Sequence, residues 1–278
     1  MSKSLQYVLG RGLGASTRLN FQHSILKEHL NGLVHSKVPL PPRPVIADIG
    51  TGTGIWPVEV LTRLKWSKDG VQGAQLHGFD VSKDQFPHES LLPKQVSLHQ
   101  QDAFGAYPDK FVGKFDLVHV RAFVSIINPD NIKPFLRGIT SLLKPGGFLQ
   151  WVDLNPINTE IRYIGRGPDP KPGHIQYAVD QYKAFRGVPI FSDLDKHTLG
   201  HGLQLVSHDA SRLEGFMLPL WFQNEVMALE DFYVRPAKMS GDPAKIQQAE
   251  ETVASFINEA QSGAYISPEV FVRVMQKA

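Results

Sequence analysis

The sequence predicts an α/β protein with a seven-stranded, mostly parallel sheet, helices on both faces, and helical cap or lid insertions. Short apolar runs alternate with helical patterns at intervals of about 15 to 30 residues, and each run is short enough to be a buried strand. This alternation is typical of parallel sheets that are covered by crossover helices. The final run, residues 269–276, follows a long helical segment, so we expect the last strand to be antiparallel.

Five apolar runs predict the strands of the core, and periodic segments predict the elements that follow them. The core runs are residues 45–49, 76–79, 96–98, 115–120 and 148–152. Farther along the chain, three helices are expected at residues 192–201, 221–233 and 243–260. A strand with its turn is expected at residues 203–215.

The pattern divides the chain into four parts. Residues 1–37 predict a helical entry or lid segment, and a proline-rich linker follows it because proline cannot continue a helix. Residues 44–156 form the expected core, and residues 157–191 a lid insertion with hinge positions in the Gly- and Pro-rich stretch 165–173. Residues 192–278 complete the sheet and contain a helical insertion at residues 216–262.

Composition excludes several classes of protein. The net charge is +2 and charged residues make up 20% of the chain, without a concentrated basic block, so no nucleic-acid partner is expected. No apolar run approaches the ~20 residues of a membrane span, and no secretory leader is evident at the N-terminus. The absence of cysteine excludes disulfides and zinc-thiolate sites. We therefore expect a cytoplasmic protein without a metal site, and a homodimer stays open.

A glycine-rich turn follows the first predicted strand. Gly50, Gly52 and Gly54 alternate with other residues, and Asp48 lies two positions before the first glycine. Glycine lets the backbone approach a ligand and leaves the next helix N-terminus open to negative charge, which suits an adenosine-containing cofactor. A dinucleotide-binding fingerprint would have the spacing Gly-x-Gly-x-x-Gly instead. The alternative is a tight turn without a ligand.

Two further carboxylates follow predicted strands. Asp80 closes the second strand, where its side chain could accept hydrogen bonds from both hydroxyls of a ribose. Asp102 follows the third strand, where it could meet an adenine amino group. Each has a structural alternative, because Asp80 could cap the next helix and Asp102 could simply stabilise a turn.

Taken in order, these segments resemble class I S-adenosylmethionine-dependent methyltransferases, and more narrowly the fungal secondary-metabolite methyltransferases. The resemblance covers about residues 15 to 155, and its motifs are Ala-Asp-Ile-Gly-Thr-Gly-Thr-Gly-Ile-Trp at 47–56, Gly-Phe-Asp-Val-Ser at 78–82, Phe-Asp-Leu-Val-His-Val-Arg at 115–121, Leu-Leu-Lys-Pro-Gly-Gly at 142–147 and Leu-Gln-Trp at 149–151. It implies a Rossmann-like fold and S-adenosylmethionine as cofactor. The cofactor-binding residues that it implies are Asp48, Gly50, Thr51, Gly52, Gly54, Asp80, Val81, Asp102, Ala103 and Arg121.

Candidates for removing a proton from the acceptor are less specific. His119 and Arg121 share one face of the fourth strand, where His119 could act as a base and Arg121 could reach the methionine carboxylate. A core histidine and a surface arginine are the alternatives. Asp153, like Asn155, follows the fifth strand and would face the acceptor. The candidate bases are therefore His119, Asp153, His23 and His174, and no spacing selects one of them.

The predicted function is methyl transfer to a small, largely apolar acceptor, by O-methylation of a secondary-metabolite intermediate. Two alternatives stay open: N-methylation of such a metabolite, and a dehydration or pericyclic step that uses the bound cofactor without methyl transfer. A regulatory protein that acts on other proteins is a third reading, which the lack of a basic patch disfavours. Aromatic residues of the predicted cap are typical of small-molecule pockets; they are Tyr163, Tyr177, Tyr182, Phe185, Phe191, Phe216, Trp221 and Phe222.

Overall fold

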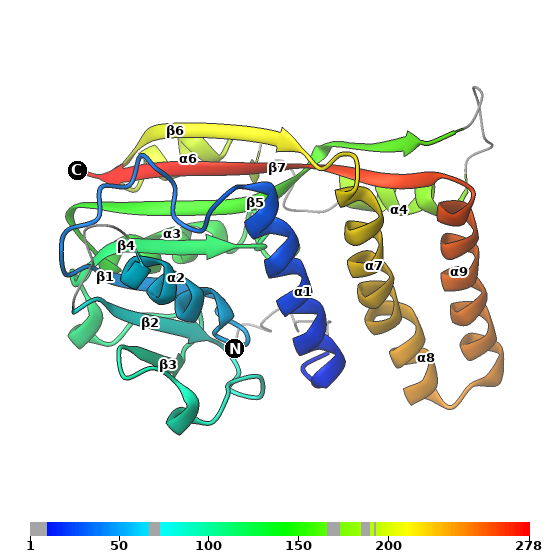
Figure 1. The fold of residues 1–278 in the computed structure, drawn as a ribbon, viewed down its shortest axis with the longest axis horizontal. Helices are drawn as coiled ribbons and strands as arrows, with labels where there is room; N and C mark the ends of the chain where they lie inside the picture. The colour runs from blue at the N-terminus through cyan, green and yellow to red at the C-terminus, as the bar shows by residue number, and fades with distance from the viewer. Residues whose placement is uncertain (1–9, 67–72, 166–172, 185–189, 192) are drawn as a thin grey trace. The chain divides into compact units, whose positions relative to one another are not determined.

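The structure is a computed structural model that describes residues 10–66, 73–165, 173–184, 190–191 and 193–278. Helices and strands alternate along the first half of the chain, and helices predominate in the second half (Figure 1). In chain order the main elements are α1 (Leu13–His29), β1 (Val45–Ile49), α2 (Ile55–Trp66), β2 (Gln75–Asp80), β3 (Val96–Gln100), β4 (Phe115–Arg121), α3 (Ile132–Leu142), β5 (Leu143–Tyr163), α4 (His174–Lys183), α6 (Leu194–Leu199), β6 (Leu203–Arg212), α7 (Met217–Leu229), α8 (Arg235–Ser240), α9 (Pro243–Gln261) and β7 (Ala264–Lys277).

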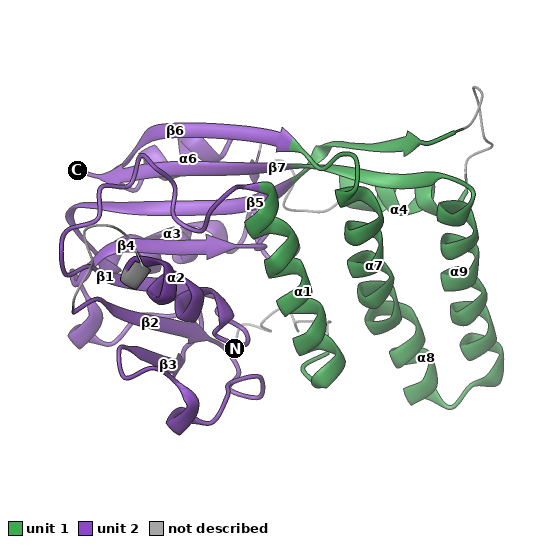
Figure 2. Ribbon diagram, in the orientation of Figure 1, with its two compact units in different colours: residues 1–29, 155–185, 212–269 green, residues 30–154, 186–211, 270–278 purple. Residues whose placement is uncertain are grey.

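The chain forms two compact units (Figure 2). Unit 1 comprises residues 1–29, 155–185 and 212–269, and unit 2 comprises residues 30–154, 186–211 and 270–278. Unit 2 contains β1 to β4 and the first half of β5, and unit 1 contains α1, α4, α7, α8 and α9. The boundary between the units falls within β5 and again within β7.

Seven strands form one sheet in the order β3-β2-β1-β4-β5-β7-β6. The pairs β1–β2, β1–β4, β2–β3 and β4–β5 are parallel. β7 runs opposite to its neighbours, as the arrows of Figure 1 show. The prediction of a seven-stranded, mostly parallel sheet with an antiparallel last strand is confirmed.

Strand alternation sends neighbouring residues of unit 2 to opposite faces of the sheet. On one face, Val118 and Val120 belong to an apolar cluster with Phe135 and Ile139 of α3. On the other face, His119 stacks on Trp56 of α2. α2 and α3 therefore cover opposite faces, as the sequence predicted.

Two strands are longer than their apolar runs indicate. β5 was expected at residues 148–152 and β7 at residues 269–276, but they extend to Tyr163 and back to Ala264. Residues 155–163 are mostly polar and mostly exposed or half-buried, so no apolar run marks them as a strand. Asp153 and Asn155 consequently lie within β5 instead of following it.

The helices of unit 1 differ in detail from the expected segments. α1 is shorter than the predicted entry segment, part of which lies outside the described residues. The helix expected at 221–233 begins at Met217 and continues through a π-helical turn, Glu230–Val234, into α8. α4 and α9 pack around Ile175, Val179 and Phe256. Most of the predicted hinge stretch, residues 166–172, lies outside the described residues, so the lid stays a prediction.

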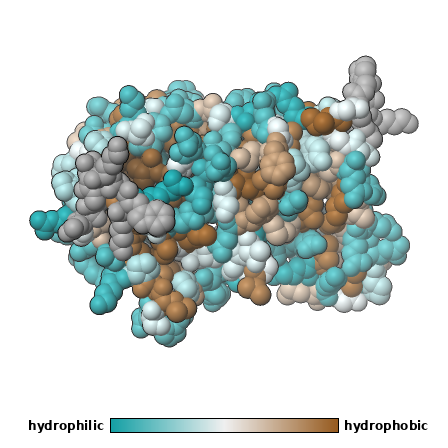
Figure 3. Space-filling model, viewed as in Figure 1, coloured by the Kyte–Doolittle hydropathy of each residue, from teal (hydrophilic) through white to brown (hydrophobic). Residues whose placement is uncertain are grey.

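Apolar side chains also reach the surface of unit 1. Leu13, Phe216 and Met239 are each more than three-quarters exposed, and Figure 3 shows apolar surface over the helices of this unit. Within the described ranges, no helix is both long and apolar enough to cross a lipid bilayer.

A histidine pair at the β2–β3 edge predicts a pH dependence of folding. His77 Nδ1 lies 3.1 Å from His99 Nε2, and the rings contact Phe79 and Phe111. Burial, reinforced by neighbouring positive charge, lowers the pKa of His77 and lowers the pKa of His99 to about 4. The folded state therefore disfavours protonation, and the stabilisation present above pH 6.5 is lost as the pH falls toward 4.

We expect His99→Phe to reduce this loss. Between pH 7 and pH 5 the free energy of unfolding of the wild type should fall by about 1 kcal/mol more than that of the variant, half of the full linkage because His99 is half exposed. Urea denaturation at both pH values measures the difference. The exposed His88 provides the control variant His88→Phe, and an equal fall in all three proteins would contradict the expectation.

Candidate functional site

The glycine turn joins β1 to α2 at the carboxyl end of the parallel strands, the edge where open α/β sheets bind ligands. Gly50, Gly52 and Gly54 have φ angles of +70°, +55° and +75°, a left-handed conformation that side chains other than glycine adopt at a cost. The backbone N–H groups of Gly50 and Thr51 both donate to the carbonyl oxygen of Phe79, at 2.8 and 3.0 Å. The turn is thereby fixed to the end of β2.

Close packing explains why two of these positions also require the absence of a side chain. A Cβ at Gly50 would lie 2.6 Å from the Phe123 ring, and a Cβ at Gly54 would lie 2.9 Å from Leu98. Phe123 therefore packs directly on the turn. No sequence pattern predicts this contact, because Phe123 lies beyond the end of β4, outside any motif.

Asp80 binds the turn from the neighbouring strand. Its Oδ2 accepts a hydrogen bond from the Gly52 N–H at 2.9 Å, and its Oδ1 accepts one from the Ser82 N–H at 3.1 Å. The Ser82 bond closes a local turn, and the Gly52 bond joins two loops that are far apart in sequence. Because each carboxylate oxygen can accept about two hydrogen bonds, binding the turn does not by itself exclude a ligand on Asp80. Val81, the next residue, is half exposed.

Asp102 combines a turn with an exposed position after β3. Its Oδ1 accepts the Phe104 N–H at 3.0 Å, which is the local bond of an Asx turn. Ala103 packs against the apolar cluster beneath α3. Asp102 is also exposed, so the turn interpretation and a binding role are compatible.

A row of buried polar side chains lies under the glycine turn. Asp48, His119 and Gln150 are register partners on β1, β4 and β5, and all three are less than 5% exposed. Gln150 is held by the backbone of the segment before β1, because its Nε2 donates to the Leu33 carbonyl and its Oε1 accepts the His35 N–H, both at 2.8 Å. Sequence reasoning did not assign a role to Gln150, although it alternates with the apolar residues of its strand.

Asp48 and His119 form the centre of this row. His119 Nδ1 lies 2.7 Å from Asp48 Oδ1, and the Thr51 hydroxyl donates to Asp48 Oδ2 at 2.7 Å. Burial lowers the pKa of His119, against the opposing effect of Asp48. The ring of His119 is therefore neutral near pH 7, and its burial matches the core histidine that the sequence left as an alternative. A role for His119 in proton transfer stays a prediction.

Arg121 follows His119 by two residues and shares its face of β4. Its guanidinium interacts electrostatically with Asp48 and with Glu59 of α2, and both carboxylates oppose the lowering of its pKa by burial. A positive charge is thus present beside the glycine turn, as an anionic ligand group would require.

The Asp153 carboxylate stabilises the segment that follows β4. Its Oδ2 accepts the Phe123 N–H at 2.7 Å and the Trp151 Nε1–H at 3.1 Å, and its Oδ1 accepts the Leu154 N–H at 2.9 Å. Burial raises the pKa of Asp153 to about 7, although these hydrogen bonds act in the opposite direction. Ala122, just before Phe123, has a φ of +59°, an uncommon conformation for alanine that the Asp153 contact helps to hold.

The remaining candidates lie in unit 1. His23 is fully buried in α1. His174 begins α4, and its Nδ1 is 3.4 Å from Glu259 Oε1, while its backbone N–H donates to the same oxygen at 2.6 Å. The candidate bases are therefore divided between the units, with His119 and Asp153 in unit 2.

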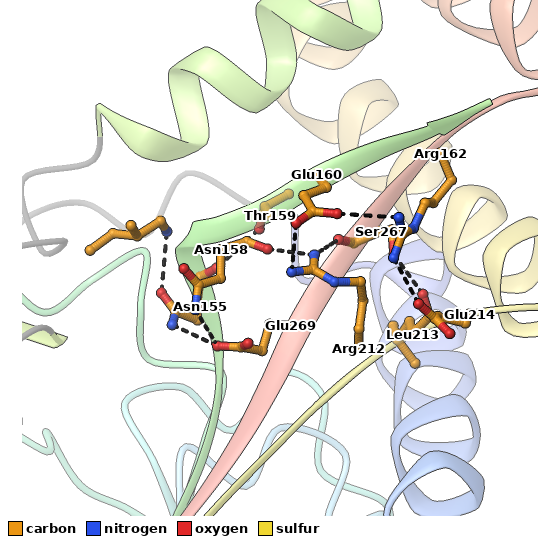
Figure 4. Close-up of polar contacts among 11 residues, drawn as sticks. Asn155, Asn158, Thr159, Glu160, Arg162, Arg212, Leu213, Glu214, Ser267 and Glu269 are labelled. Atoms are coloured by element: carbon orange, nitrogen blue, oxygen red, sulfur yellow. Dashed lines mark hydrogen bonds and ion pairs between the residues drawn. The ribbon is translucent and has the colours of Figure 1, made fainter.

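Asn155 belongs to a polar network that ties the unit 1 ends of β5 and β7 together (Figure 4). Its Nδ2 and that of Asn158 both donate to Glu269 Oε1 at 2.8 Å. Arg212 donates to the carbonyl oxygens of Asn158 and Ser267. These bonds give Asn155 a structural role in joining β5 to β7, which sequence reasoning had not predicted.

An adenosine-containing cofactor fits the turn of unit 2. Three left-handed glycines keep side chains away from the turn, the Asp80 carboxylate lies beside it, and Asp102 is exposed at the end of the next strand. Glycine loops at the carboxyl edge of an α/β sheet are typical of such sites. Across the described residues, no cluster of three His, Cys, Asp or Glu side chains is arranged to hold a metal ion.

Comparisons with known proteins identify a domain that contains the glycine turn. Residues 47–149 match a family described as a methyltransferase domain. The methyltransferase grgD from a Penicillium species is 34% identical over 188 residues, which are 66% of this chain and 63% of that protein. The N-methyltransferase verN from Clonostachys rogersoniana is 28% identical over 166 residues, which are 59% of this chain and 54% of that protein.

The fold has a counterpart among solved structures. A crystal structure from Bacillus halodurans, provisionally described as a methyltransferase, aligns with a TM-score of 0.52 at 16% identity and covers 92% of this chain and 99% of that one. The chain matches between about half and two thirds of the length of the two curated relatives.

The sheet is Rossmann-like, and residues 47–149, which carry the glycine turn, are similar to a methyltransferase domain. The chain is also similar to methyltransferases of fungal secondary metabolism. S-adenosylmethionine is the cofactor, and the expectations of fold, family and cofactor are confirmed. The roles of individual residues stay predictions.

Asp80→Ala should weaken cofactor binding without unfolding the protein. The variant loses a carboxylate that accepts hydrogen bonds, and such bonds contribute about 1.5–3 kcal/mol each, so the Kd for S-adenosylhomocysteine should rise roughly 10- to 100-fold. Isothermal titration calorimetry measures the change. The exposed Asp84 provides the matched control Asp84→Ala, and an unchanged Kd in Asp80→Ala would leave Asp80 with a purely structural role.

Proposed function

We propose that this protein transfers a methyl group from S-adenosylmethionine to a small-molecule acceptor in fungal secondary metabolism. The observation that carries the proposal is the left-handed glycine turn bound by Asp80, within a domain that matches methyltransferases. The curated relatives, one named a methyltransferase and one an N-methyltransferase, support the same class of reaction.

The proposed binding residues follow from their places in unit 2. Asp80 receives the ribose hydroxyls, Asp102 and Ala103 border the adenine, and Arg121 pairs with the methionine carboxylate. When bound, S-adenosylmethionine supplies an electrophilic methyl group. The protein contributes chiefly by alignment, because an in-line displacement depends on the approach of the acceptor atom.

Nitrogen is the acceptor atom that the two candidate bases of unit 2, His119 and Asp153, favour. A hydroxyl or phenol must lose its proton, which requires a base within hydrogen-bond reach. Nδ1 of His119 is engaged by Asp48, and both oxygens of Asp153 accept N–H groups. An amine nitrogen needs less assistance, and verN is named an N-methyltransferase. O-methylation, which the sequence predicted first, is the second candidate.

A methyl-transfer assay tests the function directly. The purified protein should transfer labelled methyl from S-adenosylmethionine to a panel of small primary and secondary amines more readily than to matched phenols and alcohols, as mass spectrometry of the products would show. Asp80→Ala serves as the variant with impaired cofactor binding. Methylation confined to hydroxyl compounds would select O-methylation. Chemical conversion of a panel compound without cofactor turnover would select the alternative in which no methyl is transferred.

Asp153→Asn separates a positioning role from proton transfer. Asparagine has a single acceptor oxygen, so if that oxygen keeps the Phe123 and Trp151 bonds, its NH2 group faces the Leu154 N–H. We therefore expect a loss of about 1–3 kcal/mol in the free energy of unfolding. The exposed Asp109 gives the control Asp109→Asn. Denaturant titration measures stability, and steady-state kinetics measure kcat. A variant with wild-type stability and a selectively lower kcat would instead support Asp153 as the base.

A further inference from the structure

We propose that His119 is a positioning residue: it holds the Asp48 carboxylate, and through it the glycine turn, in the form that binds the cofactor. In this role His119 does not take the acceptor's proton. The inference rests on the proposed function only for the identity of the cofactor, and it holds for any acceptor.

The geometry of the Asp48 carboxylate carries the first step. Each of its two oxygens has a different partner: Oδ1 lies 2.7 Å from His119 Nδ1, and Oδ2 accepts a hydrogen bond from the Thr51 hydroxyl at 2.7 Å. His119 belongs to β4, whereas Thr51 belongs to the glycine turn itself. The carboxylate is therefore a bridge between the rigid sheet and the turn, and its orientation is fixed at both ends.

Burial makes this bridge costly to break. Asp48 is 4% exposed, and a carboxylate that loses a hydrogen-bond donor in such a place keeps its desolvation cost without compensation. Space for the bridge is also provided by the neighbouring strand. A Cβ at Gly78, the register partner of Asp48 on β2, would lie 2.6 Å from the Thr51 hydroxyl.

A second contact ties His119 to the helix that follows the turn. The rings of His119 and Trp56 are parallel within 2°, with centroids 3.9 Å apart. Trp56 is the second residue of α2. One side chain on β4 thus contacts the residue before the turn, Asp48, and the first helical segment after it, so His119 fixes both ends of the turn.

The stack and the Asp48 bond also leave the His119 ring enclosed. The neutral ring donates from Nδ1 to the carboxylate, and its 1% exposure leaves the imidazole enclosed between Asp48 and Trp56. A proton acceptor in the reaction needs access to the substrate, whereas a positioning residue needs rigid contacts. The surroundings of His119 are of the second kind.

Two substitutions at residue 119 test the proposal by calorimetry with S-adenosylhomocysteine. In His119→Asn the amide N–H can replace Nδ1–H, so the Kd should stay within about threefold of the wild type. In His119→Leu that donor is lost, and the Kd should rise about tenfold or more. Val118→Ala, the neighbouring position on the opposite face of β4, controls for general damage to the core and should leave the Kd unchanged.

Kinetics add a readout that a merely structural residue would not move. With an acceptor found by the methylation assay, His119→Asn should keep the wild-type kcat and pH profile, and His119→Leu should raise KM for S-adenosylmethionine more than it lowers kcat. Equal Kd values in all variants would overturn the proposal. So would a His119→Asn protein that binds S-adenosylhomocysteine normally but loses kcat, because that pattern identifies a base.

Thr51→Val covers the case in which His119→Leu does not fold. It removes the other donor to Asp48 from the turn side, and it should weaken S-adenosylhomocysteine binding several-fold while His119→Asn does not. An unchanged Kd in Thr51→Val would then overturn the proposal. A wild-type protein that fails to bind S-adenosylhomocysteine would refute the proposed function itself, and the role of His119 would fall with it.

Discussion

The site in unit 2 depends on one buried carboxylate, that of Asp48. It lies at the end of β1 beneath the glycine turn and accepts hydrogen bonds from Thr51 in the turn and His119 on β4. A buried charge of this kind is tolerated because both oxygens are bonded to polar donors. The same bonds give the turn a fixed conformation before any ligand arrives, which reduces the ordering cost of binding.

The residues around this carboxylate pack closely, and glycines provide the space that the neighbouring side chains need. Gly78 and Gly54 make room for Thr51 and Leu98, Gly50 lies against Phe123, and Asp153 holds the backbone of Phe123 in turn. The turn is consequently bound from three strands, by the end of β2, by β4 and by β5.

The same arrangement gives His119 and Asp153, the acidic and basic candidates of unit 2, a positioning role. His119 and Asp153 resemble acid–base residues when they are seen only as residue types at strand ends. In the folded protein each uses its polar atoms to position backbone or another side chain. In the proposed reaction, alignment of the acceptor therefore contributes more than a dedicated base.

The sequence by itself determined the core strands, the glycine turn and the antiparallel last strand, because these follow from local spacing and hydrophobic alternation. The cofactor followed from the resemblance of the motifs to class I S-adenosylmethionine-dependent methyltransferases. Only the tertiary structure decided that β5 and β7 continue through polar residues, that Asn155 ties strands together, and that Phe123 packs on Gly50. It also decided the partners of His119, since the bond from β4 to Asp48 and the stack on Trp56 join segments separated by about 70 residues. Such contacts are set by strand register and side-chain packing, which no local pattern specifies.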